Sequence, residues 1–260
     1  MPQTTIPTLH NLAHSQSLRI SWALEEIRLA NPSFQFHQKN YPRTVTNSEL
    51  KKIHPLGKSP VVTLETTDGS LPPTVQLQPG ILSESKLILD FISAEYADGL
   101  FTPSAEDKNR DIFFTMFASG SLTLKADFCV IFEAPAQMAP FPFNLPFKLT
   151  GYPMVSRFLD DLQGIYQIME EALSEEKPFF SGAKLGVADL NASFGMDMAE
   201  QRGGLGNGFR GGDSEVGGWE FDLWLLGLYW DGCSEMVGLV YKMEVLTHCS
   251  GCLGDQELSG

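Results

Sequence analysis

Residues 53–64 read IHPLGKSPVVTL, and this stretch decides the fold of the first part of the chain. The closing VVTL is apolar and β-branched, which predicts a buried strand. Pro60 has no N–H to donate to a sheet, so it marks the first residue of that strand or the turn before it. Pro60 could hold a cis bond, although only about 5–6% of X–Pro bonds are cis in folded proteins. A cis bond would present the backbone of Ser59 at the end of the sheet, where an extended peptide ligand could pair with it.

The flanking sequence predicts a small α/β unit. In the first helix, apolar residues recur at the i, i+3, i+4, i+7 spacing of a single face. A proline and a glycine interrupt residues 74–81, so a strand there would be short and lie at an edge. The patterns together predict strands at 5–12, 34–39, 61–64 and 74–81, and helices at 15–30, 47–52 and from a cap at Ser83 onward.

The rest of the chain reads as helical as far as residue 202, after a linker at 99–103. We expect one long helix at 107–132, further helices at 155–174 and 187–202, and a proline-punctuated apolar loop at 135–153. Asp189 would sit at the third position of the last helix and accept a hydrogen bond from the backbone before it. The sequence therefore predicts an α/β domain at 1–98 and an all-α domain at 104–202.

Residues 203–260 differ in character, because eight glycines fall between positions 203 and 218. Each glycine in a helix interior costs about 1 kcal/mol relative to alanine, so this opening cannot continue a helix. Our hypothesis is that this atypical tail is disordered or reflects translated non-coding sequence or a wrong gene model; the alternative is a genuine lineage-specific tail. Sequencing the transcript across the Arg202 codon distinguishes the two.

Charge and composition limit the function classes. The net charge of −14 argues against nucleic acid as a partner. The acidity lies late, because residues 1–100 hold eight Lys/Arg against nine Asp/Glu, and the remainder holds ten against twenty-three. No run of about 20 apolar residues predicts a membrane span, and no secretory signal opens the chain. The four cysteines do not form a disulfide framework, and the lone Cys249-Ser-Gly-Cys252 predicts no metal site, so we expect a cytoplasmic protein with reduced thiols.

Four stretches, taken together, resemble the soluble glutathione transferases, in a fungal or bacterial type with serines before the first helix. They cover about residues 5–202, and their order and spacing carry the resemblance more than any one of them does. The stretches are LHNLAHSQSLRISW at 9–22 with LEE after it, HPLGKSPVV at 54–62, LSES at 82–85, and Gly182 with VADL at 187–190.

The resemblance implies a thioredoxin-like N-terminal domain, an all-α C-terminal domain and a homodimer. It also implies glutathione as the co-substrate and a cis bond before Pro60. By position in the motif, Ser15 is the candidate for activating the thiol and Ser17 is the second candidate, although some family members use backbone N–H groups. The residues that the resemblance assigns to glutathione binding are His54, Lys58, Ser59, Pro60, Glu84 and Ser85.

A single hydroxyl is enough for this chemistry. A free thiol has a pKa of about 8.5, so only a few per cent is thiolate at pH 7. One hydrogen bond to the charged form stabilises it by about 1.5–3 kcal/mol, which lowers the pKa by about one or two units. Alternatively, Ser15 only caps the first helix, Lys58 is only a solvated loop residue and Glu84 only complements a helix dipole.

The electrophile site is less determined by the sequence. The resemblance implies that the helix after the linker lines it, with Phe113, Phe117 and Ser121 as candidates and residues 135–147 as a lid. An aromatic stripe on a helix is more often part of a core. An apolar pocket there would suit a planar hydrophobic electrophile.

Three functions fit these residues. The first is transfer of glutathione to a hydrophobic electrophile, in detoxification or secondary metabolism. The second is a non-catalytic glutathione transferase-like module that binds ligands or partners. The third, glutathione peroxidase activity, would use the same site with a hydroperoxide.

Overall fold

A four-stranded sheet forms the first part of the chain in the computed structural model, which describes residues 3–12, 15–42 and 47–203. The strand order is β2-β1-β3-β4. The central β1 is parallel to β2 and antiparallel to β3, and β3 is antiparallel to β4. The strands are β1 (Thr5–Leu12), β2 (His37–Tyr41), β3 (Val61–Thr66) and β4 (Ile81–Ser83).

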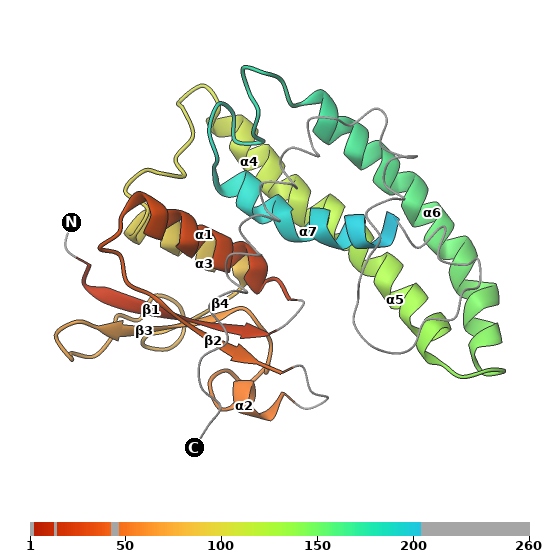
Figure 1. The fold of residues 1–260 in the computed structure, drawn as a ribbon, viewed down its shortest axis with the longest axis horizontal. Coiled ribbons are helices and arrows are strands. Elements are labelled where there is room, and N and C mark those ends of the chain that lie inside the picture. The colour runs from red at the N-terminus through yellow and green to blue at the C-terminus, as the bar shows by residue number, and fades with distance from the viewer. Residues whose placement is uncertain (1–2, 13–14, 43–46, 204–260) are drawn as a thin grey trace.

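Helices cover both faces of this sheet (Figure 1). On one face lie α1 (Ser17–Ala30) and α3 (Ser85–Glu95), whose apolar residues bury a core against β1, β3 and β4. On the other face lies the short α2 (Ser48–Lys51), where Leu50 packs with residues of β1 and β2. This is the thioredoxin-like arrangement that the sequence predicted.

Two strands lie later in the chain than predicted, and each shift has a local cause. Before β2, the Phe34 ring is buried against the Tyr96 ring at 5.2 Å between centroids, so this segment packs into the core instead of pairing in the sheet. Before β4, the Gln76 side chain bonds both backbone groups of Ser83, accepting from its N–H at 2.9 Å and donating to its carbonyl at 2.8 Å. Ser83 therefore lies in a strand, and the prediction that it caps α3 is wrong.

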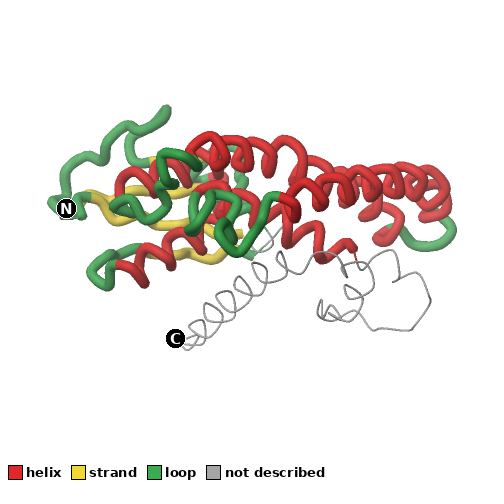
Figure 2. The backbone as a smooth tube through the Cα atoms, turned by 90° about the horizontal axis from the view of Figure 1, so that it is seen from above, coloured by secondary structure: helices red, strands yellow, loops and turns green. Residues whose placement is uncertain are grey.

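The second part of the described chain is entirely helical and extends away from the sheet (Figure 2). A nearly straight run consists of α4 (Lys108–Phe117), the π-helical turn η1 (Ala118–Thr123) and α5 (Leu124–Met138). The long α6 (Asn144–Glu171) folds back along α5, and α7 (Val187–Gly203) follows. Since α7 contacts α4, η1 and α5 as well as α1 and α3, it connects the two parts of the molecule.

The predicted loop at 135–153 is wrong, because most of it is helix. Pro135 lies inside α5 and Pro153 inside α6. Pro146 falls in the first turn of α6, where the missing N–H would have no helical partner anyway. Close packing of α5 on α6 stabilises the two helices despite their prolines. At the contact between them, a Cβ added at Gly151 of α6 would lie 2.9 Å from the carbonyl oxygen of Phe132 on α5.

The run from Lys108 to Met138 is long and apolar enough, by length and composition, to cross a membrane. In this structure it packs against α6 and α7 instead. The predicted linker at 99–103 falls between α3 and α4, and the division into domains at 98 and 104 remains a prediction. The predicted tail at 203–260 lies, except for Gly203, outside the residues that the structure describes.

Candidate functional site

The turn before β3 and the turn after β4 lie at the same end of the sheet. The Ser59–Pro60 bond is cis, as predicted. Val61, directly after it, pairs with Ser83. Glu84 follows Ser83. The turn at Pro60 and the turn at Glu84, which the sequence assigned to one ligand, therefore lie next to each other at the ends of two paired strands.

Three serine hydroxyls meet between the end of β1 and the start of α1. Ser17 Oγ lies 2.6 Å from Ser15 Oγ and 2.5 Å from Ser59 Oγ. Ser59 Oγ also donates to the His10 carbonyl at 2.8 Å and accepts from the Leu12 N–H at 3.1 Å. These bonds fix the turn before β3 against the end of β1. Ser15 and Ser59 are half-buried, whereas Ser17 has no exposed surface.

A fourth residue connects this row of hydroxyls with the start of α3. Gln16, next to Ser15, accepts a hydrogen bond from Ser85 Oγ at 2.8 Å. Glu84 is exposed and has a φ of 67°, a region that residues with a side chain rarely adopt. Such backbone conformations cluster at ligand-binding sites. Because Ser85 opens α3, its neighbouring N–H groups and the helix dipole favour an anion there.

The other two predicted glutathione ligands belong to the turn after α2. Lys58 is exposed and His54 is half-buried. The turn closes through the Gly57 N–H, which donates to the His54 carbonyl at 2.9 Å, and Asn47 Nδ2 donates to the Gly57 carbonyl at 3.2 Å. Gly57 has a φ of 57°, which a glycine adopts without strain. The turn therefore has a defined shape that leaves Lys58 in solvent beside Ser59.

Sequence reasoning missed Gln16 and His10. Gln16 could have been noticed from its place between Ser15 and the helix, but its partner is 69 residues away. The His10 ring is buried between two hydroxyls, at 2.9 Å from Tyr41 Oη and 2.9 Å from Thr63 Oγ1. Burial, and secondarily the charge of Lys39, lowers the pKa of His10, so the ring is a neutral structural element behind the hydroxyl row.

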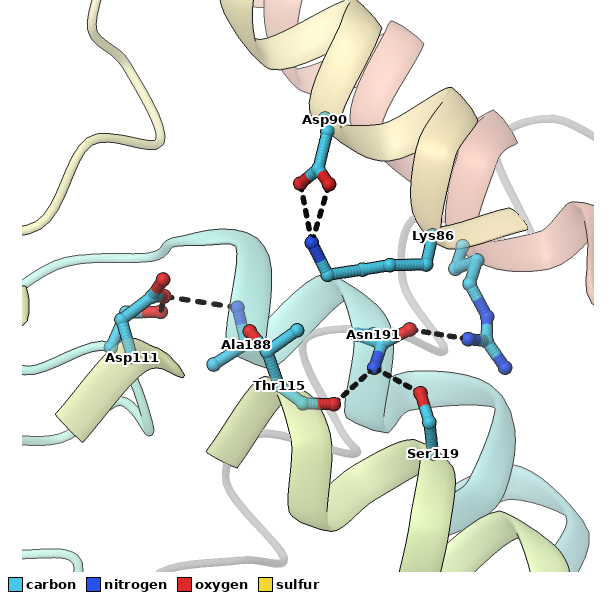
Figure 3. Close-up of polar contacts among 9 residues, drawn as sticks. Lys86, Asp90, Asp111, Thr115, Ser119, Ala188 and Asn191 are labelled. Atoms are coloured by element: carbon cyan, nitrogen blue, oxygen red, sulfur yellow. Dashed lines mark hydrogen bonds and ion pairs between the residues drawn. The ribbon is translucent and has the colours of Figure 1, made fainter. Parts of the chain in front are cut away.

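A second polar cluster surrounds the start of α7. Both carboxylate oxygens of Asp189 accept backbone bonds, from the N–H groups of Phe180 at 2.6 Å, Gly186 at 2.9 Å and Ser181 at 3.3 Å. The bond from Gly186 is the one the sequence predicted. Burial raises the pKa of Asp189 to about 6, against the opposing effect of these donors. The Ala188 N–H donates to Asp111 on α4 at 3.1 Å (Figure 3).

Asn191, one turn further along α7, joins three helices. Its Nδ2 donates to the Thr115 carbonyl at 2.7 Å and to Ser119 Oγ at 2.8 Å (Figure 3). Its Oδ1 accepts from Arg19 Nη1 at 2.5 Å. Arg19 is 2% exposed and lies 5.4 Å from the centroid of the Phe194 ring, and burial lowers its pKa to about 10. A basic residue of α1 thus connects the sheet layer to the helical part.

The predicted electrophile residues lie on the helix after the linker. Phe113 is 51% exposed and stacks on Phe117 at 5.4 Å between ring centroids. Ser121 lies in the π-helical turn, a feature frequent at functional sites. The two rings contact each other and Phe114, all on α4, so their role remains a prediction. Of the predicted lid at 135–147, only residues 139–143 lie outside a helix.

The described residues are 3–12, 15–42 and 47–203. Within these ranges no group of three or more His, Cys, Asp or Glu side chains is placed to hold a metal ion. The hydroxyl row itself offers hydrogen bonds to a ligand.

Comparisons with known proteins bear on the fold. No family model matches the chain. Glutathione S-transferase 1 of Saccharomyces cerevisiae is 24% identical over 199 residues, covering 75% of this chain and 81% of that protein.

Among solved structures, Ure2p5 from Phanerochaete chrysosporium, cocrystallized with 1-(S-glutathionyl)-2,4-dinitrobenzene, matches with a TM-score of 0.56 at 15% identity, covering 99% of this chain and all of that one. A glutathione transferase homolog from Lodderomyces elongisporus, with two glutathione molecules per subunit, matches with a TM-score of 0.54 at 18% identity, covering 92% of this chain and 98% of that one. These structural likenesses establish the fold.

Proposed function

We propose, from the glutathione transferase fold that this chain adopts, that the protein binds glutathione and transfers its thiolate to a hydrophobic electrophile. The observation that carries the proposal is the chain of hydrogen bonds from Ser59 through Ser17 to Ser15, with the adjacent Gln16 bonded to Ser85. It joins three sequence motifs that lie up to 69 residues apart into one site.

In this proposal each part of the tripeptide has a partner. The backbone of Ser59 would pair with the cysteinyl part as an added strand. Glu84 would accept from the γ-glutamyl ammonium, and Ser85 with the first N–H groups of α3 would hold the α-carboxylate. Lys58, with His54 in the same turn, would lie near the glycine carboxylate. The exposure of Glu84 and Lys58 supports these roles, because both side chains remain accessible to a ligand.

The reactive atom would be the thiolate at the start of α1. Ser15 is half-buried beside Ser17 and follows directly on the end of β1. Its hydroxyl can donate to a thiolate, and the N-terminal end of the α1 dipole favours the same negative charge. The thiolate then attacks an electrophilic carbon, and the bond to the leaving group breaks as the carbon–sulfur bond forms.

Three further features belong to the proposal. Phe113, Phe117 and Ser121 would contact the electrophile, whose class is planar and hydrophobic. The protein would act as a cytoplasmic homodimer in detoxification or secondary metabolism. Its division into a glutathione-binding domain at 1–98 and a helical domain at 104–202 would place the two substrates on different domains.

Retention on immobilised glutathione, combined with turnover of a chlorinated dinitrobenzene, tests the proposal. We expect both retention and turnover for the unaltered chain. Lys58→Met should weaken retention, whereas the matched control Lys52→Met should not, because Lys52 pairs with Glu49 on the surface of α2. Absence of both retention and turnover would overturn the proposal.

The same experiment separates the alternatives. Tight retention without turnover of any electrophile would favour the non-catalytic binding module. Turnover of a hydroperoxide, with none of the dinitrobenzene, would favour the glutathione peroxidase. The half-buried position of Ser15 at a helix start supports the transferase, because that position lets a ligand approach the hydroxyl.

A further inference from the structure

The row of three hydroxyls has a direction that follows from counting hydrogens. A serine hydroxyl has one hydrogen to donate and can accept two bonds. The His10 carbonyl can only accept, so Ser59 spends its hydrogen on that bond at 2.8 Å. At the 2.5 Å contact between Ser17 and Ser59, Ser17 must therefore be the donor. The same argument makes Ser15 the donor at its 2.6 Å contact with Ser17.

All three hydrogens thus point inward, away from the ligand. The backbone N–H of Ser17 donates to Ser15 Oγ at 3.2 Å, so Ser15 Oγ accepts one bond besides the one that it donates. In this arrangement Ser15 can accept a bond from a neutral thiol but cannot donate one to a thiolate. Stabilising the thiolate requires the Ser15 hydrogen to turn away from Ser17 toward the ligand.

We infer that Ser17 is a positioning residue that competes with the thiolate for the hydrogen of Ser15. This inference rests on the proposed function and assigns Ser17 a role other than direct contact with glutathione. Ser17 is fully buried and its hydrogen is committed to Ser59, so it acts through Ser15. A charged acceptor forms the stronger bond, so the thiolate wins the competition, but the lost bond to Ser17 reduces the gain.

The consequence is a shift opposite to the one expected of a direct donor. Ser17→Ala removes the nearer acceptor of the Ser15 hydrogen and leaves the longer contact with Ser59 Oγ at 3.4 Å, so Ser15 is freer to donate to the thiolate. The pKa of bound glutathione should therefore fall by about half a unit to one unit, the equivalent of one neutral hydrogen bond. If Ser17 itself donated to the thiolate, the same substitution would raise that pKa.

Other charged groups near the row do not enter the comparison. Titratable groups on the surrounding elements include His10 on β1, Arg19 on α1, Lys58 before β3 and Glu84 before α3. Each of them is present in both proteins, so the difference between the unaltered chain and the Ser17 variant isolates the hydroxyl. The loss of the Ser17 hydroxyl leaves Ser59 Oγ with two donors, the Leu12 N–H at 3.1 Å and Ser15 Oγ at 3.4 Å.

The experiment is a pH titration of bound glutathione, followed by the ultraviolet absorbance of the thiolate, on the full chain. Ser17→Ala should give a lower pKa, and Ser17→Cys should shift it the same way, since sulfur is a weak acceptor that fills the buried volume. Ser21→Ala is the matched control, because that serine lies one turn further along α1 and donates to Gln38. When Ser15 has already been replaced by Ala, the further substitution Ser17→Ala should not lower the pKa of bound glutathione.

Either an unchanged or a raised pKa in the folded Ser17 variants would overturn the inference. A fall that persists without Ser15 would overturn it as well, because the effect would not pass through Ser15. Calorimetric binding of glutathione separates this from the wider proposal. If neither the unaltered chain nor any variant binds glutathione, the proposed function fails. If all of them bind glutathione and its pKa does not fall in the Ser17 variants, only the role of Ser17 fails.

Discussion

The starts of α1 and α7 are both polar, but they are satisfied in different ways. At α7, one carboxylate accepts three backbone N–H groups, and Asp189 has no exposed surface. At α1, the polar groups are hydroxyls whose hydrogens can rotate, and Ser15 is half-buried. Rotatable hydrogens can be redirected to a ligand, whereas a fully buried carboxylate that is bonded to its own chain is not accessible to one.

The difference indicates that one helix start maintains the fold while the other is available for chemistry. Asp189 bonds the loop before α7 to the helix, and the adjacent Ala188 and Asn191 connect α7 to α4. Among the residues that the structure describes, the Ser15 hydroxyl bonds to the hydroxyls of Ser17 and Ser59 and to the backbone N–H of Ser17. The predictions below test this division.

The largest effect is expected from Asp189→Ala. The substitution leaves three buried N–H groups without an acceptor, and each costs about 1–3 kcal/mol, so the free energy of unfolding should fall by about 3 kcal/mol or more. Chemical denaturation measures it. The control Asp161→Ala removes a surface ion pair with Lys125 and should cost less than about 1 kcal/mol. Equal losses for the two variants would contradict the structural role of Asp189.

The charge at the start of α7 should also make stability depend on pH. Burial raises the pKa of Asp189 from 3.8 to about 6, so the folded protein binds this proton more tightly than the unfolded chain does. This contribution to stability is complete below pH 3.8 and is lost as the pH rises to about 6. Denaturation curves across this range should show the decline, and Asp189→Asn should remove it. A decline of the same size in that variant would assign it to another group.

At the other helix start, Ser15→Ala should reduce activity and leave stability nearly unchanged. One hydrogen bond to a charged group is worth about 1.5–3 kcal/mol, so kcat/KM should fall by about 10- to 150-fold. Turnover at saturating glutathione and a parallel denaturation curve measure both effects. Activity equal to that of the unaltered chain would indicate that backbone N–H groups stabilise the thiolate. A large loss of stability in Ser15→Ala would show that the start of α1, like the start of α7, maintains the fold.

The smallest effect is expected at the predicted electrophile site, which belongs to neither helix start. Phe113→Ser removes an exposed ring from α4, and we expect the KM for a planar electrophile to rise about fivefold, from the loss of about 1 kcal/mol of apolar contact. The KM for glutathione should not change. Ile168→Ser, on α6 and outside the predicted lid, is the control for loss of an exposed apolar side chain. A rise in both KM values would show that Phe113 affects the glutathione site.

Most of the first part was predictable from local pattern. The alternation at 5–12, the apolar helix face after Ser17 and the turn at Pro60 all depend on neighbours in the sequence, and the structure confirms them. The prolines at 135–153 misled the prediction, because helix packing between α5 and α6 outweighs the local cost of each proline. Ser83 misled it for a similar reason, since its backbone is bonded by Gln76, seven residues earlier.

The sequence by itself determined the order of the elements, the cis bond before Pro60, the carboxylate at the start of α7 and the set of serines at the start of α1. Only the tertiary structure decided which serine is buried, which remains accessible and in which direction their hydrogens point. The reason is that a hydroxyl's role depends on acceptors within about 3 Å. For Ser17 that acceptor is Ser59, 42 residues away, and it is placed there only when β3 pairs with β1.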